Sequence, residues 1–283
     1  MKFSIITINY NNSSGLGKTI ESVVNQSYKD FEYIIIDGGS TDGSVEIIKS
    51  YTDKITYWVS EPDGGIYNAM NKGIRQAKGD YLNFMNSGDE LYDKTVLENI
   101  APELSGSDIL VGKDYHYDTV SNQGFASILP TRISMVTFFK STLPHQGAFI
   151  RRTLFNKAPY NENLRIAADW EFYVKKIIID NCHIKLTPII VSRRAQGGIS
   201  SSQADTQRKE REAFLHQILP SGVYRDYETL SLLDQSTLYK FMHLCECTKA
   251  IKPLTLCIKL LYRFFSTSNS CHLRLPLTFL YKH

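Results

Sequence analysis

Hydrophobic and polar positions alternate in blocks over the first 90 residues of the chain. Short apolar runs predict buried strands, over 3–9, 32–37, 55–60 and 81–85. Apolar residues at helical spacing predict helices between these strands, over 16–25, 44–51 and 65–78. Strands that alternate with helices are typical of βαβ units, so the sequence predicts an α/β fold, Rossmann-like, with a mostly parallel sheet flanked by helices.

The pattern is less regular after residue 90. Apolar spacing predicts two further helices, over 96–104 and 168–179, and three further strands, over 108–113, 147–150 and 185–191. A polar stretch follows near 114–124, and the Gly/Ser-rich run at 196–202 is typical of a flexible loop. The remainder of the chain has a predominantly helical pattern.

Polar side chains gather where each of the first four predicted strands ends, over 7–12, 37–40, 61–65 and 86–90. In a parallel sheet these ends share one edge, and open α/β sheets bind ligands at that edge. The run Asp37-Gly38-Gly39-Ser40-Thr41-Asp42-Gly43-Ser44 alone fits a strand-to-helix loop equally well, because glycine turns the chain and Ser, Thr or Asp caps a helix. Four such clusters in succession indicate a ligand site.

Composition and charge narrow the class of protein. A chain of 283 residues with 42% hydrophobic residues is long enough for a large core and a cleft. Its five cysteines include no Cys-x-x-Cys pair, which argues against a disulfide framework or a zinc cage and favours a reducing compartment. We find neither a signal peptide nor an apolar run of about 18 residues, so we expect a cytoplasmic protein.

The basic residues are concentrated towards the C-terminus. Residues 240–283 carry seven Lys or Arg and one acid, a net charge of +6, whereas the first 239 residues carry −3. We therefore expect one domain at 1–215, with halves at 1–95 and 96–215, and a helical, basic C-terminal extension at 216–283. A helix over 251–265 would suit peripheral contact with an anionic membrane better than binding to nucleic acid. Packing of this helix on the first domain is an equally good interpretation.

Four motifs resemble, in order and spacing, those of the inverting family 2 glycosyltransferases with the GT-A fold, especially bacterial exopolysaccharide and colanic-acid transferases. They are Ile-Thr-Ile-Asn-Tyr-Asn-Asn at 6–12, Ile-Ile-Asp-Gly-Gly-Ser-Thr-Asp-Gly at 35–43, Ser-Glu-Pro-Asp-Gly-Gly-Ile-Tyr-Asn-Ala-Met-Asn-Lys-Gly at 60–73 and Phe-Met-Asn-Ser-Gly-Asp at 84–89. Weaker similarity extends through 145–147, 168–171 and 197–200.

The resemblance implies an inverting transferase that moves a sugar from a nucleotide diphosphate sugar, a UDP-sugar, to a glycan or lipid-linked acceptor. The implied setting is bacterial surface polysaccharide biosynthesis, on the cytoplasmic face of the membrane. Residues 1–95 would then bind the donor, and residues 96–215 would carry the acceptor and catalytic half.

The same resemblance assigns donor contacts to residues at the strand ends. It places Asp37 at the base and ribose, with Asn9 and Asp63 in the same pocket, and it counts Thr7 and Asn86 among the donor-binding residues. A carboxylate suits this work because its hydrogen bonds are charge-assisted. Turn formation is an equally good explanation for Asn9.

The run Asn86-Ser87-Gly88-Asp89 occupies the place of the family's metal-binding acidic triplet. The resemblance implies that Asp89 holds a divalent metal, Mg²⁺ or Mn²⁺, against the donor diphosphate, because hard cations prefer oxygen ligands. Gly88 stands where the family has its usual metal-contacting acid. A turn that binds no metal is the alternative.

One residue of the second half, Asp169, matches a family position, and two others are candidates because of their place in or beside loops. The resemblance makes Asp169 the general base that takes the proton of the acceptor hydroxyl, and helix capping is the alternative for this acid. His145 and Arg194 are candidates for acceptor or phosphate contacts. A structural histidine and an ordinary surface arginine are the corresponding alternatives.

Two other functions stay open at this point. A non-catalytic protein that binds a nucleotide or glycan would fit the loss of an acid at Gly88, although it would have no need of Asp169. A sugar nucleotidyltransferase usually has a glycine-rich, basic loop after its first strand, where this chain has Asn9-Tyr10-Asn11-Asn12.

Overall fold

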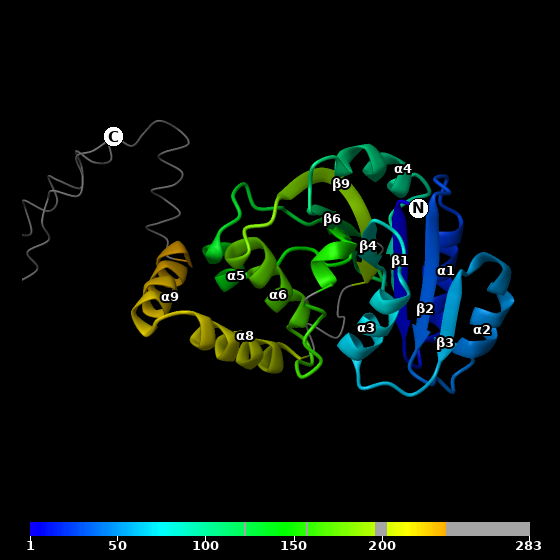
Figure 1. Ribbon diagram of the computed structural model, residues 1–283, viewed down its shortest axis with the longest axis horizontal. Helices are drawn as coiled ribbons and strands as arrows, with labels where there is room; N and C mark the ends of the chain where they lie inside the picture. The colour runs from blue at the N-terminus through cyan, green and yellow to red at the C-terminus, as the bar shows by residue number, and fades with distance from the viewer. Residues whose placement is uncertain (122, 157, 196–202, 236–283) are drawn as a thin grey trace, which may run out of the picture. The chain divides into compact units, whose positions relative to one another are not determined.

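The computed structural model describes residues 1–121, 123–156, 158–195 and 203–235. Its first four strands pair in parallel in the order β3-β2-β1-β4, and β1, β2 and β3 lie side by side in Figure 1. Their bounds are β1 Phe3–Asn9, β2 Phe31–Asp37, β3 Tyr57–Ser60 and β4 Tyr81–Phe84. The helices that connect them are α1 Ser13–Val24, α2 Ser44–Ser50 and α3 Ile66–Gln76, and a 3₁₀ turn, Thr52–Lys54, follows α2. The predicted βαβ series is therefore confirmed, with ends that move by one to three residues.

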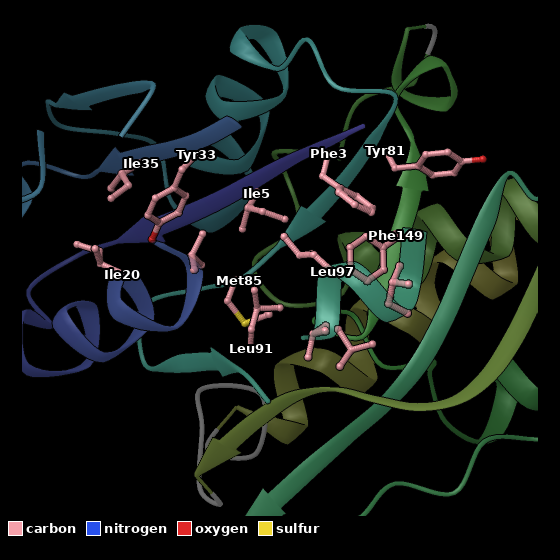
Figure 2. Close-up of a cluster of buried hydrophobic side chains, with 14 of the residues drawn as sticks. Phe3, Ile5, Ile20, Tyr33, Ile35, Tyr81, Met85, Leu91, Leu97 and Phe149 are labelled. Atoms are coloured by element: carbon pink, nitrogen blue, oxygen red, sulfur yellow. The ribbon is translucent and has the colours of Figure 1, made fainter. Parts of the chain in front are cut away.

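The two faces of this parallel sheet bury different helices. Alternate residues of a strand point to opposite faces, so Ile5 of β1 and Ile35 of β2 share one core cluster with Ile20 of α1. Figure 2 shows this group beside Tyr33 and Met85. On the other face, a Cβ added at Gly73 of α3 would lie only 2.5 Å from Ile6, so α3 packs against that side of the sheet. Helices on both faces leave the strand ends as the open edge.

The second half extends the same sheet with mainly antiparallel strands. The order continues β4-β8-β6-β9-β5, with β7 paired to β6, and among the described residues only the β6–β9 pair of this half is parallel. The bounds are β5 Asp89–Leu91, β6 Ile109–Tyr117, β7 Gly124–Ala126, β8 Ala148–Arg151 and β9 Ile184–Ala195.

The strand predicted over 108–113 is longer in the structure, because β6 continues into the polar stretch to Tyr117, and β7 begins at Gly124. Asp114 makes this stretch look polar, yet it is buried and accepts a hydrogen bond of 2.7 Å from Ser192 of β9. A polar side chain that has its own partner can lie inside a sheet.

The remaining helices are short until the end of the described chain. They are α4 Val96–Ile100, α5 Met135–Lys140, α6 Ala168–Tyr173, α8 Ala204–Ile218 and α9 Ser221–Gln235. Two 3₁₀ turns, Ala101–Leu104 and Arg152–Phe155, follow α4 and β8, and α6 continues as a π-helix, Val174–Ile179. The helices predicted over 96–104 and 168–179 therefore exist, each with a change of helix type inside it. The sequence pattern missed α5.

The chain divides into two compact units, Met1–Tyr224 and Arg225–His283. Most of the second unit lies outside the described residues, as do the predicted loop at 196–202 and the predicted helix over 251–265. The division into domains at 1–215 and 216–283 stays a prediction. Within the described part of the chain, no helix combines the length and the apolarity that a membrane crossing requires.

Candidate active site

The first part of the site lies at the ends of β1, β2 and β3, where Asn9, Asp37 and Ser60 are neighbours in the sheet register. The Asp37 carboxylate is fully buried and accepts four hydrogen bonds. Its Oδ1 accepts from Asn9 Nδ2 at 2.7 Å and from Ser40 Oγ at 2.6 Å. Its Oδ2 accepts from the Ser40 backbone N–H at 2.9 Å and from Ser60 Oγ at 2.6 Å.

These bonds determine the charge of Asp37. Burial on its own raises the pKa of this carboxyl, but the hydrogen bonds from Ser40, Ser60 and Asn9 outweigh burial and hold the pKa below its usual value. A carboxylate offers about four acceptor positions, so the described residues fill all of them. The Oδ1 atom of Asn9 is buried and has no partner among the described residues, which leaves one amide oxygen available beside the charge.

Asp63 joins this group from the loop after β3. Its Oδ1 accepts the backbone N–H of Gly65 at 2.8 Å. A Cβ added at Gly38 would lie 2.8 Å from Oδ2 of Asp63, so the two loops approach closely only because residue 38 is glycine. The structure thus brings Asn9, Asp37 and Asp63 together.

Thr7 lies deeper, in the body of β1. Its hydroxyl donates to the carbonyl of Met85 at 2.7 Å, and the Tyr33 hydroxyl, 3.0 Å away, donates to it in turn. Both bonds are internal to the sheet. Donor contact by Thr7 therefore stays a prediction, and the described contacts give this side chain a structural role.

The second part of the site is the turn between β4 and β5. The backbone N–H of Asp89 donates to the Asn86 carbonyl at 2.9 Å, which closes the turn. Gly88 has a φ of +99°, a conformation that favours glycine, and its N–H donates to Thr19 Oγ1 at 3.0 Å. The backbone at position 88 thus explains why glycine replaces the usual acid.

Asp89 is half-buried, and its Oδ2 accepts a hydrogen bond of 2.8 Å from Gln146 Nε2. Burial raises the pKa of this carboxyl to about 7, although the charge of Arg194 and the bond from Gln146 lower it. Arg194 lies directly opposite Asp89 in the β5–β9 register. Its Nε is buried and has no partner among the described residues, so it can still bind an anion.

The oxygen atoms of this turn fit a divalent metal to which the protein supplies only a few of the ligands. Within the described residues, no three His, Cys, Asp or Glu side chains converge on one point. However, Oδ1 of Asn86 is buried and unpartnered in the same part of the chain, close in sequence to the Asp89 carboxylate. One carboxylate and one amide oxygen are ligands that Mg²⁺ accepts when phosphates and water supply the rest.

The third part of the site is Asp169 in the first turn of α6. Its Oδ1 accepts a hydrogen bond of 2.9 Å from the hydroxyl of Tyr67, a buried residue of α3. Among the described residues, Oδ2 of Asp169 accepts no hydrogen bond. The carboxylate is thus fixed from the first half of the domain by one oxygen.

Other acids perform the helix-stabilising work that was the alternative for Asp169. Glu171 forms an ion pair with Lys175 and accepts from Asn161 Nδ2 at 3.1 Å. The Ala167 cap residue of α6 has no side-chain cap, and the backbone N–H groups just before the helix bind Glu210 instead. Asp169 lies in the first turn of α6, where an acid favours the helix dipole, but it is not the N-cap, so its role as the base stays a prediction.

His145 lies in an aromatic cluster rather than at an open surface. It is buried, its Nε2 lies 2.9 Å from the Tyr160 hydroxyl, and its ring stacks on Phe84 at a centroid distance of 5.2 Å. Burial lowers the pKa of its imidazole, Asp169 raises it and Arg194 lowers it again. A neutral imidazole with this partner fits the structural interpretation.

Several residues that shape the site were not among the sequence candidates. The sequence pattern could have identified Ser40 and Ser60, because both are polar and lie at the ends of predicted strands. Tyr67 had a weaker signal, since it belongs to the motif at 60–73. Gln146 lies in the weakly similar run at 145–147, but nothing in that run distinguishes it from its neighbours. Glu210 acts through contacts distant in sequence, and no pattern in the chain identifies it.

The ends of a parallel sheet thus gather an ionised aspartate, an acid-bearing turn and a carboxylate on a facing helix. Together with the antiparallel extension of the sheet, this arrangement defines the GT-A class of glycosyltransferase.

Comparison with known proteins identifies the family. Residues 4–162 match the sequence profile of the family described as "Glycosyl transferase family 2". The chain belongs to this family. An uncharacterized glycosyltransferase of Mycobacterium tuberculosis is 35% identical over 189 residues, which are 62% of this chain and 69% of that one. A PGL/p-HBAD biosynthesis glycosyltransferase of Mycobacterium bovis is 30% identical over 217 residues, covering 72% of this chain and 81% of the relative.

Solved structures share the fold at lower identity. S. aureus TarS in complex with UDP has a TM-score of 0.62 and 20% identity, with 83% of this chain and 71% of that chain covered. The mannosyltransferase PcManGT of Pyrobaculum calidifontis, in complex with GDP-Man and Mn²⁺, has a TM-score of 0.54 and 14% identity, with coverages of 85% and 82%. The chain is therefore a transferase enzyme with the GT-A fold, and family membership decides against the non-catalytic binder and the nucleotidyltransferase.

Proposed function

We propose that this enzyme transfers a sugar from a UDP-sugar to a hydroxyl group of a glycan or lipid-linked acceptor, with inversion at the anomeric carbon. The observation that carries the proposal is the Asp169 carboxylate, which Tyr67 holds by one oxygen at 2.9 Å. A carboxylate with one bonded oxygen keeps the other for the proton of an incoming hydroxyl.

The donor nucleoside would bind at the ends of β1 to β3. Asp37 is ionised and pre-oriented there, and the unpartnered amide oxygen of Asn9 lies beside it. Both are hydrogen-bond acceptors, which suits a base or ribose that offers N–H and O–H donors. Structures of TarS with UDP and with UDP-GlcNAc support a uridine nucleotide as the donor.

The donor diphosphate would lie at the turn between β4 and β5. Asp89 and the Asn86 amide oxygen would hold a divalent metal there, and that metal would neutralise negative charge on the departing diphosphate. Arg194, opposite Asp89 in the sheet, would bind a phosphate oxygen through its unpartnered Nε. The Mn²⁺ of the PcManGT complex supports a metal-dependent reaction.

In the transfer step the acceptor hydroxyl attacks the anomeric carbon from the face opposite the diphosphate. Asp169 takes the hydroxyl proton, the new glycosidic bond forms, and the bond to the diphosphate breaks in the same displacement. A general base of this kind contributes about 10²–10⁴-fold to the rate. A single displacement inverts the anomeric centre.

The cellular setting follows from the acceptor. We infer a role in bacterial surface polysaccharide biosynthesis, with the enzyme on the cytoplasmic face of the membrane. The motif similarity to exopolysaccharide transferases supports this role, and so does the relative named for PGL/p-HBAD biosynthesis. Peripheral membrane contact through residues 251–265 belongs to the same proposal.

A donor screen tests the proposal directly. The purified chain is incubated with a panel of UDP- and GDP-sugars, with Mn²⁺, with Mg²⁺ or with a chelator, and release of the nucleoside diphosphate is measured. We expect one UDP-sugar to be consumed in a metal-dependent reaction, and Asp169→Asn to lose this activity while it still binds UDP. Equal release by Asp169→Asn and the unaltered enzyme would refute the assignment of the base.

A further inference from the structure

Helix α8 supplies the start of α6 with its hydrogen-bond acceptor. The carboxylate of Glu210 accepts three backbone N–H groups, from Arg165 to Oε1 at 2.7 Å and from Ile166 and Ala167 to Oε2 at 3.0 Å each. The first backbone amides of a helix have no partner inside the helix. Ala167, the N-cap residue, cannot cap with its own side chain, and a residue more than 40 positions away binds its N–H and the two N–H groups before it.

The same face of α8 packs against α6 around the residue that follows Asp169. The Trp170 ring meets Phe214 edge-on at a centroid distance of 5.8 Å, and the Arg211 guanidinium lies 5.2 Å from the Trp170 ring. Phe214 is buried. Figure 1 shows α8, in yellow, beside the green α6. Hydrogen bonds and packing thus join two helices on either side of Asp169.

Arg211 also interacts electrostatically with Asp169, the proposed base. Burial lowers the pKa of its guanidinium, while the carboxylate of Asp169 and the hydroxyl of Tyr67 raise it. The Asp169 carboxylate is thus hydrogen-bonded to a tyrosine of α3 and interacts electrostatically with an arginine of α8. The carboxylate of Glu210 is the contact that fixes the backbone beneath it.

We infer that Glu210 is a positioning residue for the reaction: by binding the backbone amides of 165–167 it sets where α6 begins, and so where Asp169 meets the acceptor hydroxyl. The inference rests on the proposed role of Asp169. Misplacement of a reacting group by about 1 Å can cost about 100-fold in rate. Donor binding, at the far strand ends, does not involve α8.

The test is Glu210→Gln, which keeps the size of the side chain but replaces one acceptor oxygen by a donor NH₂. Glu212→Gln is the matched control, because it makes the same change on the same helix, where Glu212 pairs only weakly with Arg208 at 3.6 Å. The measurements are kcat and donor KM for UDP release from the UDP-sugar consumed fastest in the screen, UDP affinity by calorimetry, and amide hydrogen exchange of 165–167.

We expect Glu210→Gln to lower kcat by about 10- to 100-fold, to leave donor KM and UDP affinity unchanged, and to speed exchange at 165–167. Glu212→Gln should change none of these. Unaltered kcat in a folded Glu210→Gln protein would overturn the inference. If Glu210→Gln does not fold, Glu210→Asp keeps the charge with a shorter reach, and full kcat in that variant would overturn it equally.

A double variant separates positioning from general damage. If Glu210 acts through Asp169, adding Glu210→Gln to Asp169→Asn should not lower the residual rate further. If the rate losses of the two single variants multiply in the double variant, Glu210 does not act through Asp169. Activity of Asp169→Asn alone at the level of the unaltered enzyme refutes the proposed base instead, so the two failures are distinguishable.

Discussion

The sharpest stability prediction concerns Asp37, whose four hydrogen bonds hold three strand ends together. Replacing it by Asn keeps the shape and removes the charge. The amide can still bond to all partners, because Asn9 has an unpartnered Oδ1 that a flip of its side chain would present to the new NH₂. Asp37→Asn should therefore fold, with four neutral bonds in place of four charge-assisted ones.

The magnitude follows from this exchange. A hydrogen bond to a charged group contributes about 1.5–3 kcal/mol and a neutral one about 0.5–1.5 kcal/mol, so each conversion costs about 1 kcal/mol. Four conversions cost about 4 kcal/mol, and the neutral amide recovers about half of that because it is cheaper to bury. We expect the free energy of unfolding to fall by about 2 kcal/mol. In the proposed donor site, UDP affinity should fall at least about tenfold, which corresponds to about 1.4 kcal/mol.

Urea unfolding and UDP titration measure both effects, and the chain contains its own control. Asp42 belongs to the same loop and accepts three hydrogen bonds, from the Ser13 and Ser44 backbones and the Ser44 hydroxyl, but it is exposed. Asp42→Asn should cost clearly less stability and leave UDP affinity unchanged. Equal losses in the two variants, or none in Asp37→Asn, would show that burial of the charge is not what matters here.

Three further predictions address the rest of the site. Tyr67→Phe removes the hydrogen bond to Asp169 and should lower kcat by about tenfold or more without changing UDP affinity, measured by UDP release and calorimetry. Gly88→Ala should lower the free energy of unfolding by about 1–3 kcal/mol in urea, since φ is +99° there, and an unchanged midpoint would contradict this. Asp89 has a raised pKa of about 7, so Mn²⁺-dependent UDP binding should weaken by up to about tenfold for each pH unit below 7. In the metal-free protein, the stability that Asp89 contributes is lost as the pH rises through this pKa. A UDP affinity that does not change with pH would refute the role of this carboxylate.

The sequence predicted the parallel half of the fold well for a physical reason. Strands β1, β2 and β4 are covered on both faces, so most of their residues are apolar, and the few polar ones inside them, such as Thr7 and Asn83, do not hide the pattern. The grouping of Asn9, Asp37 and Asp63 followed from that edge. In the antiparallel half, buried polar partners such as Asp114 and Ser192 interrupt the apolar pattern, and β6 therefore looked shorter than it is.

Contacts between elements distant in sequence could not be predicted in the same way. The bonds from Tyr67 to Asp169 and from Glu210 to 165–167 span 102 and about 45 positions and depend on how whole helices dock. Gly88 is instructive because its residue type suggested a missing metal ligand. Its positive φ shows that the turn favours glycine, so the residue type at this position also reflects backbone geometry.

The filled carboxylate of Asp37 has a consequence for nucleotide recognition in the proposed donor site. Since all four acceptor positions are occupied, a base or ribose group can bind Asp37 only by replacing a donor that is already there. The Ser40 and Ser60 hydroxyls can rotate away and find other partners, whereas the Ser40 backbone N–H cannot. Exchanging one hydroxyl donor for another changes little free energy. Selectivity for the nucleotide must therefore come from how well its edge fits between Asn9, Asp37 and Asp63, rather than from the strength of any single bond to the carboxylate.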